Sequence, residues 1–235
     1  MIKNVRRRQM VKARQQELAR AMAKRRPAME LALALFIPAG MCVLFFYIFQ
    51  GPEPNMQPDP IKTYESSLNA ETRALLRECP QSDGFDFPVG KPDAKEYFDM
   101  RPFGVKNHLG ADWNRGFRDD DLGDPVYSVS KGIVSFTGNL GGDWGRIVRV
   151  IHRVDEDEYV ESLYAHLRDI YVKQGDLVGR GQKVGTIGNN DGRERAHLHF
   201  EIRSRVGMPV GPGYSEDTSG YLNPTPFIQR NRSNP

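Results

Sequence analysis

Short runs of alternating apolar and polar residues, separated by Gly, Asp and Asn, constrain the fold of this 235-residue chain most strongly. They begin after Phe85 and include GIVSFTG (132–138), RIVRVIH (146–152), YVESLYAHL (159–167) and LHFEIR (198–203). A period of two is typical of half-buried strands, and closely spaced turn signals favour many short strands. About 145 residues are enough for one core of this kind. The sequence therefore predicts a mostly β domain.

The N-terminal part of the chain has a different character. Residues 31–49, LALALFIPAGMCVLFFYIF, carry no charge, and at 1.5 Å per residue they can cross a hydrocarbon core of about 30 Å. Residues 1–26 hold ten basic residues and one acid, and such a flank stays in the cytoplasm. These features predict a short N-terminal transmembrane helix in the cytoplasmic (inner) membrane. The chain would pass once, with its N-terminus in the cytoplasm and its C-terminal bulk extracytoplasmic, on the periplasmic or cell-wall side.

The apolar segment has three other interpretations. A cleaved signal peptide has a shorter apolar core and a small-x-small cleavage site, which FQGPEP after Phe49 does not offer. A lipoprotein signal ending at Cys42 is disfavoured because the bulky Met41 stands where a small residue is expected. A buried core helix is disfavoured by the flanking charge. The sequence favours the membrane anchor.

Charge is distributed unevenly along the chain. The total is 33 basic and 30 acidic residues, so the part after residue 26 carries 23 basic and 29 acidic residues. The basic tail has no interleaved aromatic residues, which disfavours nucleic acid as a partner and favours anionic lipid. We therefore expect no nucleic-acid binding.

A linker follows the apolar segment. Residues 50–60, QGPEPNMQPDP, hold four prolines and predict an extended spacer. Residues 61–79 contain helix formers, and NAET (69–72) is a plausible helix start, so we expect a juxtamembrane helix that ends before Pro80. The two cysteines form no metal-binding pair.

Histidine is scarce, and four of the five histidines lie in three short sequence strings, the first of which also contains Asp112. The strings are NHLGAD (107–112), YAHL (164–167) and AHLHFEIR (196–203). His197 and His199 lie two apart in a predicted strand, so they share one face, with Cα atoms roughly 6.5–7 Å apart. One imidazole can bind a metal while the other faces the same groove. Two His and one carboxylate form a Zn²⁺ ligand set that leaves a position for water.

His108 and Asp112 are four residues apart, which on a helix would place them on one face. Gly110 lies between them, and Asn107 and Asn114 flank them. We therefore expect a strand end or a loop rather than a helix at this position.

The three strings, in this order, resemble the LytM/lysostaphin-type zinc metallopeptidases, which are peptidoglycan endopeptidases. The resemblance covers roughly residues 84–230 and includes GDPVYSVSKGIV (123–134), VKQGDLVGRGQKVGTIG (172–188) and GYLNPTPFI (220–228). It implies an antiparallel β-sheet peptidase domain. It also implies that zinc is bound by His108, Asp112 and His199, and that His166 and His197 are the catalytic histidines.

The chain departs from the family pattern in two places. NNDGRERA (189–196) is charged and lacks the Gly-Pro turn that usually precedes H-x-H, and WNRGFRDDDLG (113–123) is longer than the usual link. All five site positions are nevertheless kept, so the resemblance implies an active enzyme that hydrolyses peptide bonds of peptidoglycan stem peptides or cross-links during cell-wall remodelling. The alternative is a non-catalytic LytM-domain regulator that activates a cell-wall amidase.

The expected organisation follows from these observations. It comprises a basic cytoplasmic tail (1–26), a transmembrane anchor (27–49), a Pro-rich linker with a short helix (50–83), a LytM-type metallopeptidase domain (84–230) and a C-terminal tail (231–235). Expected partners are peptidoglycan, the cytoplasmic membrane through the anchor, and other cell-wall enzymes.

We expect structural rather than catalytic roles for the residues outside the three strings. His152 lies in an alternating run before an acidic turn, which predicts a histidine on the sheet surface. Trp113 and Trp144 are expected in the core or at the rim of a peptide groove. The glycine-rich hairpin also resembles those of biotinyl and lipoyl carrier domains, but Lys183 lies in a strand-like run rather than at a turn tip, so close strand packing is preferred. We expect residues 211–220 to form a mobile loop.

Overall fold

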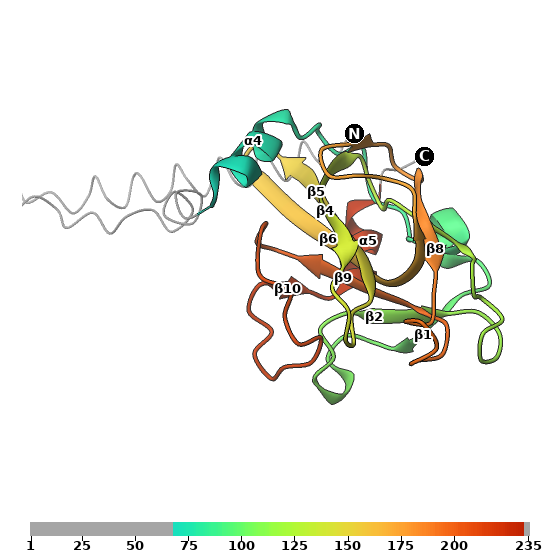
Figure 1. The fold of residues 1–235 in the computed structure, drawn as a ribbon. Helices are drawn as coiled ribbons and strands as arrows, with labels where there is room; N and C mark the ends of the chain where they lie inside the picture. The colour runs from blue at the N-terminus through green and yellow to red at the C-terminus, as the bar shows by residue number, and fades with distance from the viewer. Residues whose placement is uncertain (1–67, 233–235) are drawn as a thin grey trace, which may run out of the picture. The chain divides into compact units, whose positions relative to one another are not determined.

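The computed structural model describes residues 68–232, which fold around an antiparallel sheet. The expected basic tail, the apolar segment 31–49 and most of the linker lie outside the described residues. Among residues 68–232, no helix has the length and apolar character that crossing a membrane requires. The expectation of a mostly β, antiparallel fold is confirmed (Figure 1).

Ten strands of the described region form one sheet. Its main path runs β1-β2-β9-β6-β5-β4-β7, with β10 paired to β9 and with β8 paired to both β3 and β6. The bounds are β1 Phe98–Arg101, β2 Ala111–Asn114, β3 Pro125–Tyr127, β4 Gly132–Asn139, β5 Arg146–Asp155, β6 Glu158–Ile170, β7 Leu177–Val178, β8 Lys183–Ile187, β9 Leu198–Arg203 and β10 Tyr221–Leu222.

Two helices and two short turns complete the described region. Helix α4, Ala70–Glu78, begins at Asn69, whose side chain accepts a hydrogen bond from the backbone N–H of Thr72. This is the start expected from NAET. Helix α5, Pro224–Asn231, has a proline in its first turn. The short turns are η1, Gly90–Ala94, and η2, Val105–Asn107.

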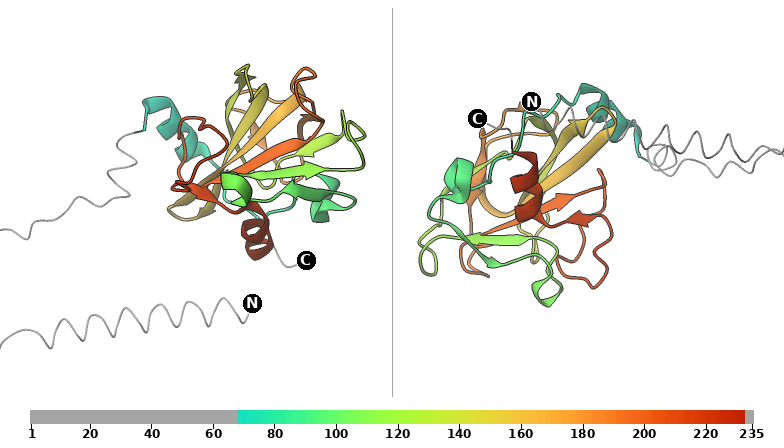
Figure 2. Two further views of the ribbon diagram at one scale, coloured as in Figure 1. Left: turned by 90° about the horizontal axis from the view of Figure 1, so that it is seen from below. Right: turned by 180° about the vertical axis from the view of Figure 1, so that it is seen from behind.

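The sheet is buried on both faces. Val148 and Val150 of β5 contribute to the main core, together with Phe227 and Ile228 of α5. Ile151, on the opposite face of β5, packs under helix α4 with Ile133 and Cys79. Figures 1 and 2 show α5 against the sheet and α4 at the end of β5 and β6. Alternation indicates strands with one buried face, but in this sheet both faces of β5 are buried.

His152 corrects one expectation, because it is fully buried rather than on the sheet surface. It alternates in step with Val148 and Val150, so it points into the main core, where its ring contacts Phe85. Its nitrogens bond the Lys131 carbonyl at 2.9 Å and the Ser162 hydroxyl at 2.7 Å. Burial without a charged partner lowers the pKa of His152 to about 4.

Candidate metal centre

Neighbouring strands bring the three sequence strings together. His108 directly follows η2, Asp112 lies in β2 and His199 lies in β9, where Asp112 and His199 are direct partners in the antiparallel register. The same β9 residue faces Ala165 of β6 on its other side, which places His166 beside the cluster. The position of His108 and Asp112 at a turn and a strand, rather than on a helix, matches the expectation from Gly110.

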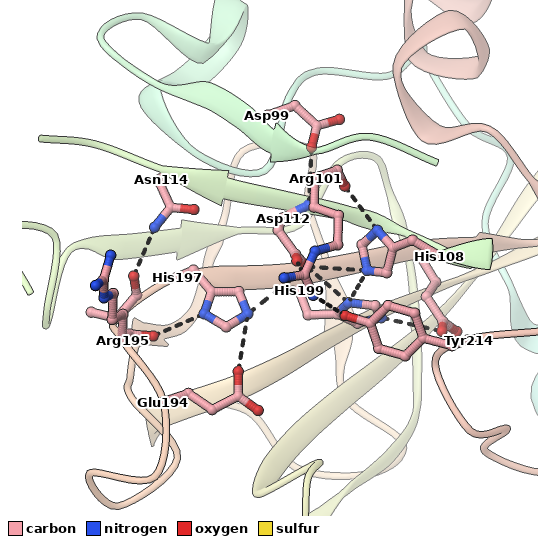
Figure 3. A network of polar contacts seen from close by, with 12 residues as sticks. Asp99, Arg101, His108, Asp112, Asn114, Glu194, Arg195, His197, His199 and Tyr214 are labelled. Atoms are coloured by element: carbon pink, nitrogen blue, oxygen red, sulfur yellow. Dashed lines mark hydrogen bonds and ion pairs between the residues drawn. The ribbon is translucent and has the colours of Figure 1, made fainter. Parts of the chain in front are cut away.

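His108, Asp112 and His199 form a compact triangle of donor atoms (Figure 3). His108 Nε2 lies 3.0 Å from His199 Nδ1, and Asp112 Oδ1 lies 3.2 Å and 3.1 Å from these two atoms. Ligands held at about 2.0–2.1 Å in a tetrahedron are roughly 3.3 Å apart. The triangle therefore has the dimensions of a zinc site, and all three residues are buried.

Hydrogen bonds outside the triangle set the tautomers of its two imidazoles. His108 Nδ1 lies 2.8 Å from the carbonyl oxygen of Arg101, so this nitrogen carries the proton. His199 Nε2 lies 3.2 Å from the Glu201 carboxylate, so it is the protonated nitrogen of that ring. In these tautomers two imidazole lone pairs and one carboxylate oxygen face one another. Three acceptors at this distance need a shared cation, so the residues fit a metal ion.

The electrostatics of the triangle also favour positive charge. Burial alone would raise the pKa of Asp112, but hydrogen bonds with His108 and His199 outweigh it and hold that pKa well below its usual range. Burial would likewise lower the pKa of His199, but its bonds to Asp112 and Glu201 raise it to about 9. At neutral pH His199 is thus protonated where a metal ion would bind, and binding of a metal ion would release this proton.

His166 reaches the site because β6 contains a β-bulge. Between the pairs Arg146–Leu167 and Val148–Tyr164 the register shifts, and His166 adopts a φ of 59°. His166 is 6% exposed, and its Nδ1 has no hydrogen-bond partner. Burial, together with the neighbouring His197 and His199, lowers the pKa of His166 to about 3, so the ring is neutral.

His197 lies on the other side of the triangle, just before β9. Its Nδ1 donates to the carbonyl oxygen of Arg195 at 2.9 Å, which leaves the Nε2 lone pair free. That Nε2 lies 3.8 Å from Asp112 Oδ1, and the rings of His197 and His166 are 4.6 Å apart. The structure therefore brings all five predicted site residues together, while their roles stay predictions.

The link after Asp112 holds the backbone in front of His197. Asp119 Oδ1 accepts a hydrogen bond from the N–H of Ala196 at 2.7 Å, and Asn114 Nδ2 donates to the carbonyl of Ala196 at 2.9 Å. The unusual length of 113–123 thus provides contacts that fix the approach to H-x-H.

A cleft lies over the five residues. Trp144, Glu194 and Tyr214 line it together with the site residues, and Trp144 is the tryptophan at the rim, whereas Trp113 is in the core. Glu194 and Tyr214 were missed as cleft residues. For Glu194 the available signal was the charged segment that replaces the usual Gly-Pro turn.

Tyr214 belongs to the loop that was expected to be mobile. Its ring packs against His108 with centroids 5.1 Å apart and planes tilted by 34°, and its hydroxyl accepts a hydrogen bond from Arg101. Backbone bonds from Leu109 N–H to Gly213 and from Ser215 N–H to Asn107 attach the middle of the loop to the site. Protection of these amides from hydrogen exchange is the measurement that tests the expected mobility.

Comparisons with known proteins identify relatives of this region. A model of peptidase family M23 matches residues 107–212. The chain is 34% identical over 90 residues to lipoprotein NlpD of Yersinia enterocolitica, and this match covers 38% of this chain and 87% of the relative. It is 35% identical over 106 residues to peptidoglycan DD-endopeptidase ShyA of Vibrio cholerae, and this match covers 45% of this chain and 22% of the relative.

Among solved structures, lysostaphin from Staphylococcus simulans is 25% identical with a TM-score of 0.41, covering 57% of this chain and 48% of that one. The chain spans about a third or less of the length of most curated relatives that it matches.

The comparisons correct the expected localisation. Several relatives are lipoproteins by name, and a lipoprotein is held at a membrane by an attached lipid rather than by a spanning helix. The single-pass inner-membrane protein inferred from residues 27–49 is therefore wrong. A long apolar run near a basic flank is a pattern that spanning helices and export signals share.

Proposed function

Because the chain belongs to peptidase family M23, we propose that it is a zinc metalloendopeptidase that hydrolyses peptide bonds of peptidoglycan. The observation that carries this proposal is the cluster of His108, Asp112, His166, His197 and His199 in one cleft. The family is zinc-dependent, and the donor triangle fits that ion.

The ligands in this proposal are His108, Asp112 and His199. A zinc ion bound to them would polarise the scissile carbonyl and lower the pKa of water toward neutrality. Glu201 and the carbonyl of Arg101 orient the two ligand imidazoles, since each accepts the proton of the ring nitrogen that faces away from the triangle.

The proton transfers fall to His166 and His197. His197 has its Nδ1 proton engaged by Arg195, so its Nε2 lone pair is available to accept a proton from the attacking water. His166 is neutral and buried beside it, and can stabilise the oxyanion or take part in protonating the leaving amine. Trp144 and Tyr214 supply the apolar sides of a cleft for an extended peptide.

The test uses the purified chain, isolated cell-wall sacculi and one equivalent of zinc, with and without chelator. We expect chelator-sensitive release of fragments whose masses correspond to cleavage at a peptide amide. Tight zinc binding without cleavage would contradict the endopeptidase. That outcome would favour the non-catalytic regulator, which is then tested by adding a cell-wall amidase and measuring its activation.

A further inference from the structure

Glu194 stands beside the two proposed catalytic histidines and has no part in the proposed reaction. One donor atom each from His166, Glu194 and His197 lies within 4.8 Å of the other two. His166 comes from the bulge of β6, and the other two come from the loop before β9. None of these three residues belongs to the donor triangle of His108, Asp112 and His199. The three side chains therefore form a second group of the same composition, two imidazoles and one carboxylate.

The donors of this group are available. His197 Nε2 carries a lone pair and lies 3.8 Å from Glu194 Oε2. His166 is buried, 6% exposed, and its Nδ1 lacks a hydrogen-bond partner. Among residues 68–232, no Lys or Arg lies within ion-pair distance of the Glu194 carboxylate, whose contact at that distance is His197 Nε2. Within the described residues, the Glu194 carboxylate thus has no Lys or Arg partner, and His166 Nδ1 has no hydrogen-bond partner.

We propose that His166, Glu194 and His197 form a second divalent-metal site, suited by its ligands to Zn²⁺, whose occupation inhibits the protein. Metal binding there stands on the geometry alone. The inhibition rests on the proposed peptidase function, because a metal on both imidazoles removes the two groups that transfer protons.

The second site binds more weakly than the first. Asp112 Oδ1 lies only 3.8 Å from His197 Nε2, so the two cations would lie close together and repel each other. The Glu194 side chain is also 40% exposed, which makes its carboxylate better hydrated than that of Asp112, at 4%. Zinc therefore fills the Asp112 triangle first, and inhibition appears only after one equivalent.

The experiment titrates the metal-free full-length chain with Zn²⁺ against a competing chelator and follows hydrolysis of sacculi over the same range. We expect two classes of site in the wild type. Glu194→Gln should weaken the second class about tenfold or more and leave the first unchanged, since even indirect partners of a metal change affinity 10–100-fold. Expressed relative to its own activity at one equivalent, hydrolysis by the variant should resist inhibition by excess zinc. Glu156→Gln, at an exposed position in the β5–β6 turn, is the matched control and should behave as the wild type.

A single class of site in the wild type, or a second class that Glu194→Gln leaves unchanged, would overturn the proposal. Failure of the proposed function gives a different pattern. Two classes, the weaker one sensitive to Glu194→Gln, without any hydrolysis would support the site and overturn both the endopeptidase and the inhibitory role. Hydrolysis with one class of site would overturn the second site alone.

Discussion

Groups that touch no metal set the chemistry of the donor triangle. Glu201 and the Arg101 carbonyl hold the protons of His199 and His108 on the nitrogens that face away from the triangle. His166 has no such partner at Nδ1, and its proton position is therefore free to change. The free Nδ1 sets His166 apart from the two ligand imidazoles. His197 has its Nδ1 proton engaged by Arg195 and is set apart from them by its position, with Nε2 3.8 Å from Asp112 Oδ1.

The role assignment predicts a clear separation between two variants. His108→Ala removes a ligand, so zinc content and hydrolysis should be lost together. His166→Ala should retain one tightly bound zinc while kcat falls about 10²–10⁴-fold, the usual contribution of acid–base groups. Zinc content by mass spectrometry and turnover of sacculi are measured on the same samples. Loss of the tight zinc from His166→Ala would show that His166 is itself a ligand.

Buried His152 predicts a pH dependence of stability. Its pKa is about 4 in the folded protein and about 6.5 when unfolded, so between these values the unfolded chain binds more protons. The free energy of unfolding should be unaffected by His152 above pH 6.5, should fall as the pH drops toward 4, and should lose about 3 kcal/mol in total.

The control for this prediction is His152→Gln, which cannot titrate. The difference in urea-unfolding free energy between pH 7 and pH 4.5 should be larger in the wild type than in this variant. Equal differences would mean that His152 is charged or exposed in the folded protein.

At the scale of secondary structure, β9 carries the site because both of its faces are buried. Leu198, Phe200 and Ile202 enter the main core, while His199, Glu201 and Arg203 face the other side. On that side Arg203 lies 3.6 Å from Glu201 and 3.5 Å from Glu161. Arg203 also donates to the carbonyls of Met208 and Pro209, so the segment after β9 covers this polar row. Paired burial of the charges keeps Glu201 in place beside His199.

Gly188 holds the two proposed catalytic histidines in place. It follows β8, pairs with His197 through its carbonyl, and lies against the bulge of β6. A Cβ at this position would come within 2.4 Å of the His166 carbonyl oxygen and 2.7 Å of the Arg168 nitrogen. Both are backbone atoms, which cannot move without displacing the strand.

Gly188→Ala should therefore lower the free energy of unfolding by about 1–3 kcal/mol, the usual cost of overpacking, and reduce hydrolysis more than zinc content. Gly179→Ala is the matched control, because the nearest atom to its new Cβ is a side-chain oxygen 3.9 Å away. Urea unfolding of both variants gives the comparison. Equal stability of the two would refute the close contact at Gly188.

At the scale of the whole described region, helix α4 closes the end of the sheet away from the core that α5 covers. Leu75 and Leu76 pack with Ile133, Ile151 and Cys79, and the Tyr159 hydroxyl donates to the Leu76 carbonyl at 3.3 Å. Burial raises the pKa of the Cys79 thiol to about 11. The thiol is therefore a probe of whether α4 stays docked.

In a Cys42→Ser background, Cys79 should react with a thiol reagent at pH 8 at least about a hundredfold more slowly than in urea, because less thiolate forms at the higher pKa. Leu76→Ala should accelerate the native reaction, while Arg77→Ala, at an exposed neighbouring position, should not. Rapid labelling of the native protein would mean that α4 is not held on the sheet.

Many of the strands and the start of helix α4 could be predicted from the amino-acid sequence. Alternation in 132–138, 146–152 and 198–203 predicted strands that the structure contains as β4, β5 and β9, since a period of two is a local property of the backbone. The start of α4 at Asn69 was likewise local. Alternation does not say what covers each face, and for that reason His152 was expected on the surface.

The amino-acid sequence alone is enough to recognise the chemical types of the site, which are two His and a carboxylate with two further imidazoles, and the strands that carry most of them. Tertiary structure decided how they meet. In a regular β6, His166 would share the face of Tyr164, away from His199, and only the bulge at positive φ turns it into the cleft. The nitrogens that face the triangle, and the approach of Glu194 to His197, depend on partners far along the chain. Such contacts arise from packing across the whole sheet, which no local pattern encodes.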